Sequence, residues 1–339
     1  MAAEELIVTS FVHPRRGHVH CPAGPAVTGH LRRLGHQARL GSSAMRPQLH
    51  QDGGTLFTAS YLDRSGMAVG IGVAANNTDD VALQAAADAV ATWSAIWRTR
   101  RVLMATPRCS CASAMADSRH SHCPLMAWAT SETARFAERG DQVVIIGKHD
   151  DTPAQALLAR TREAIIVESP SEVASLHLDP ERVAYIISPG TIVEMAARVI
   201  AALRARYPAI RGMHPDGLCY AASDWAATAL TVISACDVAL VLTSPGNAAN
   251  ASYSGRTPVH VIDSVDHIEP NWLANAESVG LILSASAPVS LQRETVTALS
   301  GLGPLSLAQR KVSTEVSKVD MWLSTHTTNS PLVHPIVTL

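Results

Sequence analysis

Two stretches of equal length decide the fold of this chain: HCPLMAWATSETARFAERGDQVVII at 122–146 and LCYAASDWAATALTVISACDVALVL at 218–242. In each, a cysteine, Cys123 or Cys219, precedes a helix-length segment, and a short apolar run follows that segment. A short apolar run after a helix is typical of a buried strand in an α/β protein. We therefore predict a duplicated unit, with helices over 125–139 and 220–235 and strands over 143–146 and 238–242.

The register of the two units continues beyond these stretches. Ile187 lies 64 residues after Cys123, and Leu283 lies 64 residues after Cys219. Both units contain further short apolar runs, as expected for parallel strands that crossover helices cover on both faces. A repeat of this length predicts an α/β fold of pseudo-repeated lobes, each with a small parallel sheet and flanking helices. The further elements expected are strands 165–167, 183–187, 259–262 and 279–283, and helices 192–206 and 289–300.

A third copy of the unit is expected to begin at Cys21. We expect a helix over 84–98, a last strand over 102–105, and a hairpin over 55–74 with its turn at Arg64-Ser65-Gly66. Three lobes around a pseudo-threefold axis would bring their equivalent positions together at a central site. The predicted domains are a divergent first lobe at 1–117, a second lobe at 118–215, a third lobe at 216–303 and a C-terminal tail at 304–339.

The composition and charge indicate which classes of protein this chain can belong to. Of the 339 residues, 47% are hydrophobic and 17% are charged, which is an ordinary globular balance, and a net charge of −2 gives no reason to expect nucleic acid as a partner. No apolar run reaches the ~18 residues of a membrane span, and the first residues do not resemble a secretory signal, so we expect a cytoplasmic protein without membrane attachment. The basic group Arg98, Arg100 and Arg101 is interpreted as a solvated helix end.

The cysteines carry the predicted chemistry. In a reducing compartment thiols are more often buried, catalytic or metal-bound than paired in disulfides. The repeated cysteines stand at helix starts, where the helix dipole favours the thiolate that binds metal. Cys21, Cys123 and Cys219 are therefore predicted to hold one iron–sulfur cluster with an open iron. Cys109 or Cys111 could replace Cys21 as the third ligand, and Cys236 is interpreted as an inert core residue.

Several motifs resemble the 4-hydroxy-3-methylbut-2-enyl diphosphate reductase family, IspH/LytB. The family's Thr-Cys-Pro-Leu-Val, Ile-Cys-Tyr-Ala and Gly-Ala-Ser-Ala-Pro are similar to the segments at 122–126, 218–221 and 284–288. The stretch Pro14–Gly24 loosely resembles the family's Asn-Pro-Arg-Gly-Phe-Cys-Ala-Gly. The order and spacing of these motifs are more specific than any one of them.

This resemblance implies a three-lobed reductase with one [4Fe–4S] cluster on three cysteines. Its implied reaction is the two-electron reductive dehydroxylation of an allylic diphosphate or a related substrate, in isoprenoid precursor synthesis or specialised metabolism. It also implies an external electron donor, such as ferredoxin or flavodoxin.

The resemblance also implies site residues, although several family positions have changed. The family's proton-relay glutamate is replaced by Ala154, and a neighbouring histidine by Thr152. Two hydroxyl residues of the phosphate-binding segment have become alanine, which should weaken diphosphate binding. The residues that remain for catalysis are His149, Asp150, Asp151 and Thr191, and those for substrate binding are His50, Asn247, Asn250 and Ser286.

Two other classes of function stay open at this point. The loss of the family's glutamate also favours a second class, a catalytically silent [4Fe–4S] protein, such as a redox or iron sensor or the partner subunit of an enzyme. The third hypothesis is a metal-free α/β binding protein, in which the cysteines are buried core residues. Ser188 and Thr191 could also simply cap the helix over 192–206.

Overall fold

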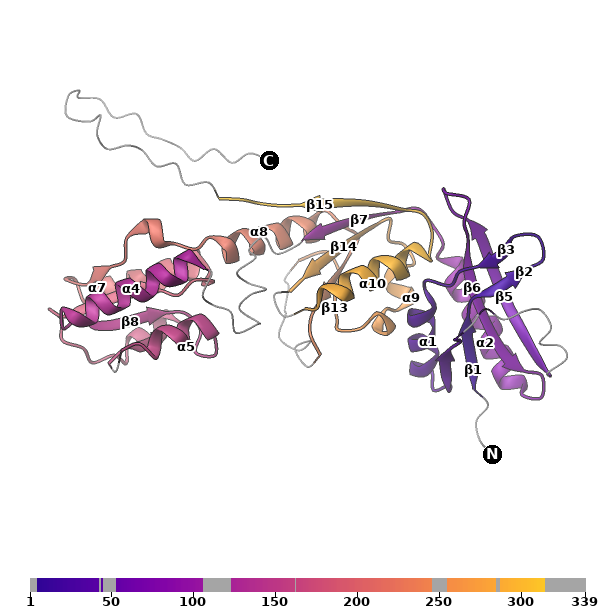
Figure 1. The fold of residues 1–339 in the computed structure, drawn as a ribbon, viewed down its shortest axis with the longest axis horizontal. Helices are drawn as coiled ribbons and strands as arrows, with labels where there is room; N and C mark the ends of the chain where they lie inside the picture. The colour runs from indigo at the N-terminus through magenta and orange to yellow at the C-terminus, as the bar shows by residue number, and fades with distance from the viewer. Residues whose placement is uncertain are drawn as a thin grey trace, which may run out of the picture.

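The fold is described from a computed structural model, which covers residues 5–42, 44, 53–105, 123–161, 163–245, 255–284 and 287–314. The three lobes lie in a row, with the third lobe between the second and the first (Figure 1). The α/β class with parallel sheets is confirmed. No helix among the described residues is long and apolar enough to cross a membrane.

The second lobe is a four-stranded parallel sheet in the order β11-β10-β8-β9. Its strands β8 and β10 are almost entirely buried, which explains why they are continuously apolar in sequence. Helix α4 begins directly after its N-cap, Cys123, with Pro124 in the first turn. The elements of this lobe are α4 (Pro124–Glu138), β8 (Gln142–Ile146), α5 (Thr152–Leu158), β9 (Ile165–Val167), α6 (Pro170–Val173), β10 (Val183–Ile187), α7 (Val193–Arg206) and β11 (Arg211–Gly212).

The third lobe repeats this arrangement and extends it. The order β14-β12-β13 matches β10-β8-β9, and all neighbouring strands are parallel. The predicted duplication is therefore confirmed at the level of sheet topology. The elements are η3 (Pro215–Gly217), α8 (Ala221–Ser234), β12 (Val238–Leu242), β13 (Val259–Ile262), η5 (Val265–His267), α9 (Pro270–Leu273), β14 (Ser278–Leu283), α10 (Val289–Ser300) and β15 (Leu305–Arg310).

The first lobe differs from the predicted third copy. Its sheet, in the order β4-β1-β6-β5, is mixed, because the predicted hairpin pairs β6 antiparallel to both β1 and β5. Helix α2 starts four residues earlier than predicted, since the Asp79 side chain accepts hydrogen bonds from the amides of Val81 and Ala82. The elements are β1 (Leu6–Thr9), β2 (Phe11–His13), β3 (Gly17–Val19), α1 (Gly24–Arg33), β4 (Ala38–Leu40), β5 (Gly54–Leu62), β6 (Ala68–Asn76) and α2 (Asp80–Ala95).

Strand β7 (Arg100–Ala105), predicted as the last strand of the first lobe, lies in the sheet of the third lobe. It runs parallel between β14 and β15. Strand β15 comes from the region that the sequence was expected to leave as a tail, so residues 305–310 belong to the third lobe. Buried residues of the first lobe and of one face of the third lobe's sheet form one continuous core, the other face of that sheet has a separate core, and the second lobe has a core of its own.

The chain after β15 is anchored to α8. The buried carboxylate of Asp224 accepts hydrogen bonds from the backbone N of Thr314, at 2.9 Å, and from its Oγ1, at 2.7 Å. The Thr228 hydroxyl accepts a further bond from the backbone N of Val312, at 2.8 Å. These contacts hold residues 312–314 against the helix that follows Cys219.

Replacing Asp224 by alanine is expected to release Thr314 from α8. Loss of the two hydrogen bonds should cost about 1–3 kcal/mol locally, and amide hydrogen exchange at Thr314 should accelerate accordingly. Thr231→Ala is the matched control, because the Thr231 hydroxyl bonds only within the same helix, to the Ala227 carbonyl. Equal protection of Thr314 in both variants would contradict an anchoring role for Asp224.

Candidate functional site

The carboxyl ends of β8 and β10 form the edge at which the predicted catalytic residues of the second lobe gather. The turn after β8 contains Gly147, and the turn after β10 contains Ser188 and Thr191. The two turns are in close contact, because a Cβ added at Gly147 would lie 3.0 Å from Ser188 Cβ and 3.4 Å from Thr191 Oγ1. Thr191 is buried, and its hydroxyl donates to the Ile146 carbonyl at 3.3 Å.

The two acidic residues in the turn after β8 differ in their burial. Asp150 is exposed, while Asp151 is half-buried at the N-cap of α5. Burial and the neighbouring charge of Asp150 raise the pKa of the Asp151 carboxyl above its usual value. Ala154 is fully buried, so no acidic side chain extends from that position.

His149 is held away from the buried part of this edge. Its Nε2 lies 2.9 Å from Glu172 Oε2, and more than half of its side chain is exposed. Although burial alone would raise the pKa of Glu172, hydrogen bonds from His149, the Glu168 amide and Ser169 lower it. His149 is thus the hydrogen-bond partner of Glu172 in this arrangement.

Two features of this edge were not predicted from the sequence: the environment of Ser188 and the hydrogen bond that Ser223 makes at the start of α7. The Ser188 hydroxyl is fully buried and has no hydrogen-bond partner among the described residues, which marks a polar niche beside Thr191. Neither Ser188 nor Thr191 caps α7; Ser223 of α8 accepts from the Val193 amide at 2.9 Å instead. The repeat offers no signal for a cap that comes from another lobe.

The three predicted cluster ligands occupy different surroundings. Cys21 packs against the core shared by the first and third lobes, and burial raises the pKa of its thiol to about 11. Cys123 packs against the core of the second lobe. Cys219 follows Leu218, which packs against that same core, and Gly217 leaves no room for a Cβ against the Trp128 ring of α4. Helices α1 and α4, which follow Cys21 and Cys123, lie far apart along the molecule (Figure 1).

The expected convergence of the three thiols is therefore not found in this arrangement. Among the described residues, no group of three or more His, Cys, Asp or Glu side chains is placed to hold a metal ion. The donor type fits an iron–sulfur cluster, because Cys21, Cys123 and Cys219 are all free and partly exposed. Their positions do not fit one, since the second lobe has its own core and stands apart from Cys21. Cys236 is buried, as predicted.

The remaining predicted residues lie outside the part of the chain that the structure describes. These are His50, Asn247, Asn250 and Ser286, together with the alternative ligands Cys109 and Cys111.

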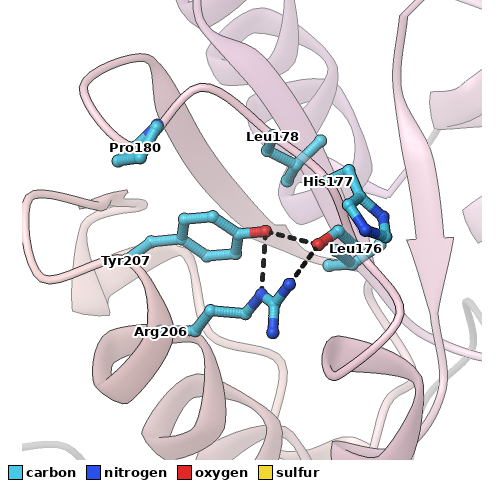
Figure 2. Close-up of a pocket in the computed structure, with 6 residues that line it drawn as sticks. All are labelled: Leu176, His177, Leu178, Pro180, Arg206 and Tyr207. Carbon is cyan, nitrogen blue, oxygen red and sulfur yellow. Dashed lines mark hydrogen bonds between the residues drawn. The ribbon is translucent and has the colours of Figure 1, made fainter.

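One pocket of the second lobe, of about 410 Å³, contains none of the predicted residues (Figure 2). It lies at the loop before β10, and its polar groups bond to one another. The Leu176 carbonyl accepts from Arg206 Nη2 at 2.8 Å and from the Tyr207 hydroxyl at 2.9 Å. The His177 ring is engaged by the Ser175 carbonyl at 2.8 Å. This pocket is consistent with a structural role, because its donors are already used within the protein.

Comparison with known proteins places these features in a family. A family model described as "LytB protein" matches residues 111–300. A relative named 4-hydroxy-3-methylbut-2-enyl diphosphate reductase 2, from Mycobacterium bovis, is 36% identical over 206 residues, which cover 57% of this chain and 61% of the relative. A reductase of the same name without the number, from Chromohalobacter salexigens, is 31% identical over 196 residues, covering 53% of this chain and 61% of that protein. The chain thus matches less than two thirds of the length of these relatives.

Among solved structures, the E-1-hydroxy-2-methyl-but-2-enyl-4-diphosphate reductase of Plasmodium falciparum aligns with a TM-score of 0.46 at 16% sequence identity. The alignment covers 66% of this chain and 74% of that structure.

Proposed function

Because the chain belongs to the LytB protein family, we propose that it is a two-electron reductase of 4-hydroxy-3-methylbut-2-enyl diphosphate or of a related allylic substrate. The observation that carries this proposal is the family match over 111–300, which includes both cysteines of the internal repeat. An external electron donor, such as ferredoxin or flavodoxin, is part of the proposal, because the sequence contains no nucleotide-binding motif that would indicate a bound reductant.

We propose further that Cys21, Cys123 and Cys219 are the ligands of a [4Fe–4S] cluster. When bound, such a cluster supplies electrons and an iron open to a substrate oxygen. The arrangement described above does not bring the three thiols together, so cluster binding requires the second lobe to move towards Cys21. A displacement of this kind is plausible physically, because the second lobe folds around its own core.

For proton delivery we propose Asp151. It stands at the same edge as Thr191, one turn before the position at which the family has its glutamate. A carboxyl in this half-buried position retains its proton at higher pH than an exposed one, as a general acid must. Thr191 and Ser188 would line the same edge as polar contacts for the substrate.

Asp151→Asn is expected to lower kcat by about 10²-fold or more, because general acids typically contribute 10²–10⁴-fold. Asp150→Asn is the matched control: it removes a neighbouring charge of the same sign and should keep kcat at low pH. Since Asp150 raises the pKa of Asp151, this control should move the alkaline fall in activity to lower pH. Steady-state rates over a pH series measure both effects. Equal losses in the two variants would contradict the assignment to Asp151.

The proposed activity is tested with anaerobically reconstituted protein, reduced viologen dye as the electron donor and the allylic diphosphate as substrate. Substrate-dependent oxidation of the dye, with two electrons consumed per product, is the expected result. Retention of the cluster without turnover of this substrate or its close analogues would contradict the reductase proposal.

A further inference from the structure

A second pocket, of about 560 Å³, lies at the amino edge of the sheet of the third lobe. Arg100 is the first residue of β7, Glu277 directly precedes β14, and Ser306 is the second residue of β15. The predicted substrate residues of this lobe follow the carboxyl ends of β12 and β14. A strand of six residues at about 3.3 Å per residue separates the two edges by roughly 20 Å. The pocket is therefore distinct from the candidate active site.

The pocket is basic, and its charge is not neutralised. Arg98, Arg100 and Arg101 line it against one carboxylate, Glu277. Among the described residues, none of these four side chains forms an ion pair within 4.0 Å. The interpretation of this basic group as a solvated helix end is wrong for Arg100, which is fully buried. Burial, with a smaller effect from the charge of Arg98, lowers the pKa of Arg100 to about 10.

Three N–H groups on the residues that line this pocket are buried without a hydrogen-bond partner in the described part of the chain. They are Nε1 of Trp97 and Nε of both Arg98 and Arg100. Buried donors are rarely left unpaired, because each costs about 1–3 kcal/mol. In the other pocket, around Leu176, the corresponding Nε of Arg206 does have a partner, since it donates to the Tyr207 hydroxyl at 3.2 Å.

The position of the donors is fixed by packing. The Arg100 guanidinium is held by the carbonyls of Ile96, at 2.6 Å, and Leu302, at 2.8 Å. The Trp97 ring stacks edge-on against Tyr61 at 4.8 Å between ring centroids. Opposite Arg98, Gly303 has a φ of +127° and leaves no room for a Cβ. Packing thus fixes the positions of the Arg100 and Trp97 side chains.

We propose that this pocket is an anion site that takes a small ligand carrying a phosphate group. Unpartnered N–H groups and uncompensated guanidinium charge are the features with which proteins recognise phosphate oxygens. The site lies outside the proposed reductase centre. A phosphate-bearing ligand would therefore bind to the third lobe at the opposite edge of its sheet. This inference does not depend on the proposed reductase activity.

The test titrates the full chain, labelled with ¹⁵N at its tryptophans, with inorganic phosphate at constant ionic strength kept by potassium chloride. Trp97→Phe identifies the indole N–H signal of Trp97. We expect this signal to shift in a saturable manner, and Arg98→Gln to weaken the affinity by about tenfold or more through the loss of a charged donor. Arg139→Gln, at an exposed arginine at the end of α4, is the matched control and should leave the affinity unchanged.

Two results would overturn the proposal. One is a Trp97 signal that does not move with phosphate beyond its response to potassium chloride alone. The other is an Arg98→Gln variant that binds phosphate as tightly as Arg139→Gln. Phosphate bound only in the proposed active site would leave the Trp97 signal in place, and so would also count against this pocket.

Discussion

Replacing Cys219 by serine is expected to abolish cluster binding, and with it all reductase activity. A serine hydroxyl is a poor substitute for a thiolate as an iron ligand, and two remaining cysteines cannot hold a cubane that three would otherwise hold. The measurement is iron and sulfide content after anaerobic reconstitution and desalting, together with the visible absorbance of the cluster.

Cys236→Ser is the matched control for this variant. Cys236 lies buried beyond the C-terminal end of the same helix, packed against the core beneath α8 and β14. Its replacement should cost some stability but retain the iron. If Cys219→Ser bound as much iron as Cys236→Ser, the assignment of Cys219 as a ligand would be refuted.

The largest effect on stability is expected for Arg100→Met. The guanidinium of Arg100 donates to the carbonyls of Ile96, Leu302 and Leu273, the last at 3.1 Å, and more weakly to that of its neighbour Arg98, at 3.5 Å. These carbonyls come from three separate segments. Those of Leu302 and Leu273 also accept from the amides of Arg98 and Ala276, so among the described residues the substitution leaves the Ile96 carbonyl without a donor. A loss of about 1–3 kcal/mol in the free energy of unfolding is expected, because that is the typical cost of one unsatisfied buried acceptor.

Urea unfolding followed by circular dichroism measures this loss. The neighbouring substitution Arg101→Met is the matched control, since Arg101 is exposed, and surface changes are usually within about 0.5 kcal/mol. Equal midpoints for the two variants would show that Arg100 does not hold these segments together.

The strands of the repeated units were predictable almost to the residue. β9, β10, β12 and β13 have the expected bounds, while β8 and β14 each gain one residue. Parallel strands covered on both faces are continuously apolar, and this signal is local in sequence. The duplication also implies that the two units share one strand order, and β10-β8-β9 does match β14-β12-β13.

The placement of β7 and β15 could not be predicted in the same way. β7 has the expected apolar pattern, but no local signal tells which sheet it joins. β15, with the sequence LSLAQR, is partly or fully exposed along its whole length and occupies the edge of the sheet. An edge strand of this kind lacks the apolar run from which the other strands were recognised.

The geometry of the candidate site was only partly predictable from the sequence. The repeat identified Cys123 and Cys219, and the turns after β8 and β10 do come together, as the carboxyl ends of neighbouring parallel strands must. The orientation of the second lobe relative to Cys21 is a property of packing between cores, which no motif encodes. The burial of Arg100 was missed for a similar reason, because arginine is usually solvated and its carbonyl partners are distant in sequence.

Our central proposal is that Cys21, Cys123 and Cys219, one from each lobe, bind one iron–sulfur cluster once the second lobe has moved towards Cys21. Its most direct test is the iron and acid-labile sulfide content of the full-length protein after anaerobic reconstitution and removal of unbound metal. We predict about four iron and four sulfide ions per chain, with the broad visible absorbance of a [4Fe–4S] cluster. A protein that remains folded but retains no iron would contradict the claim.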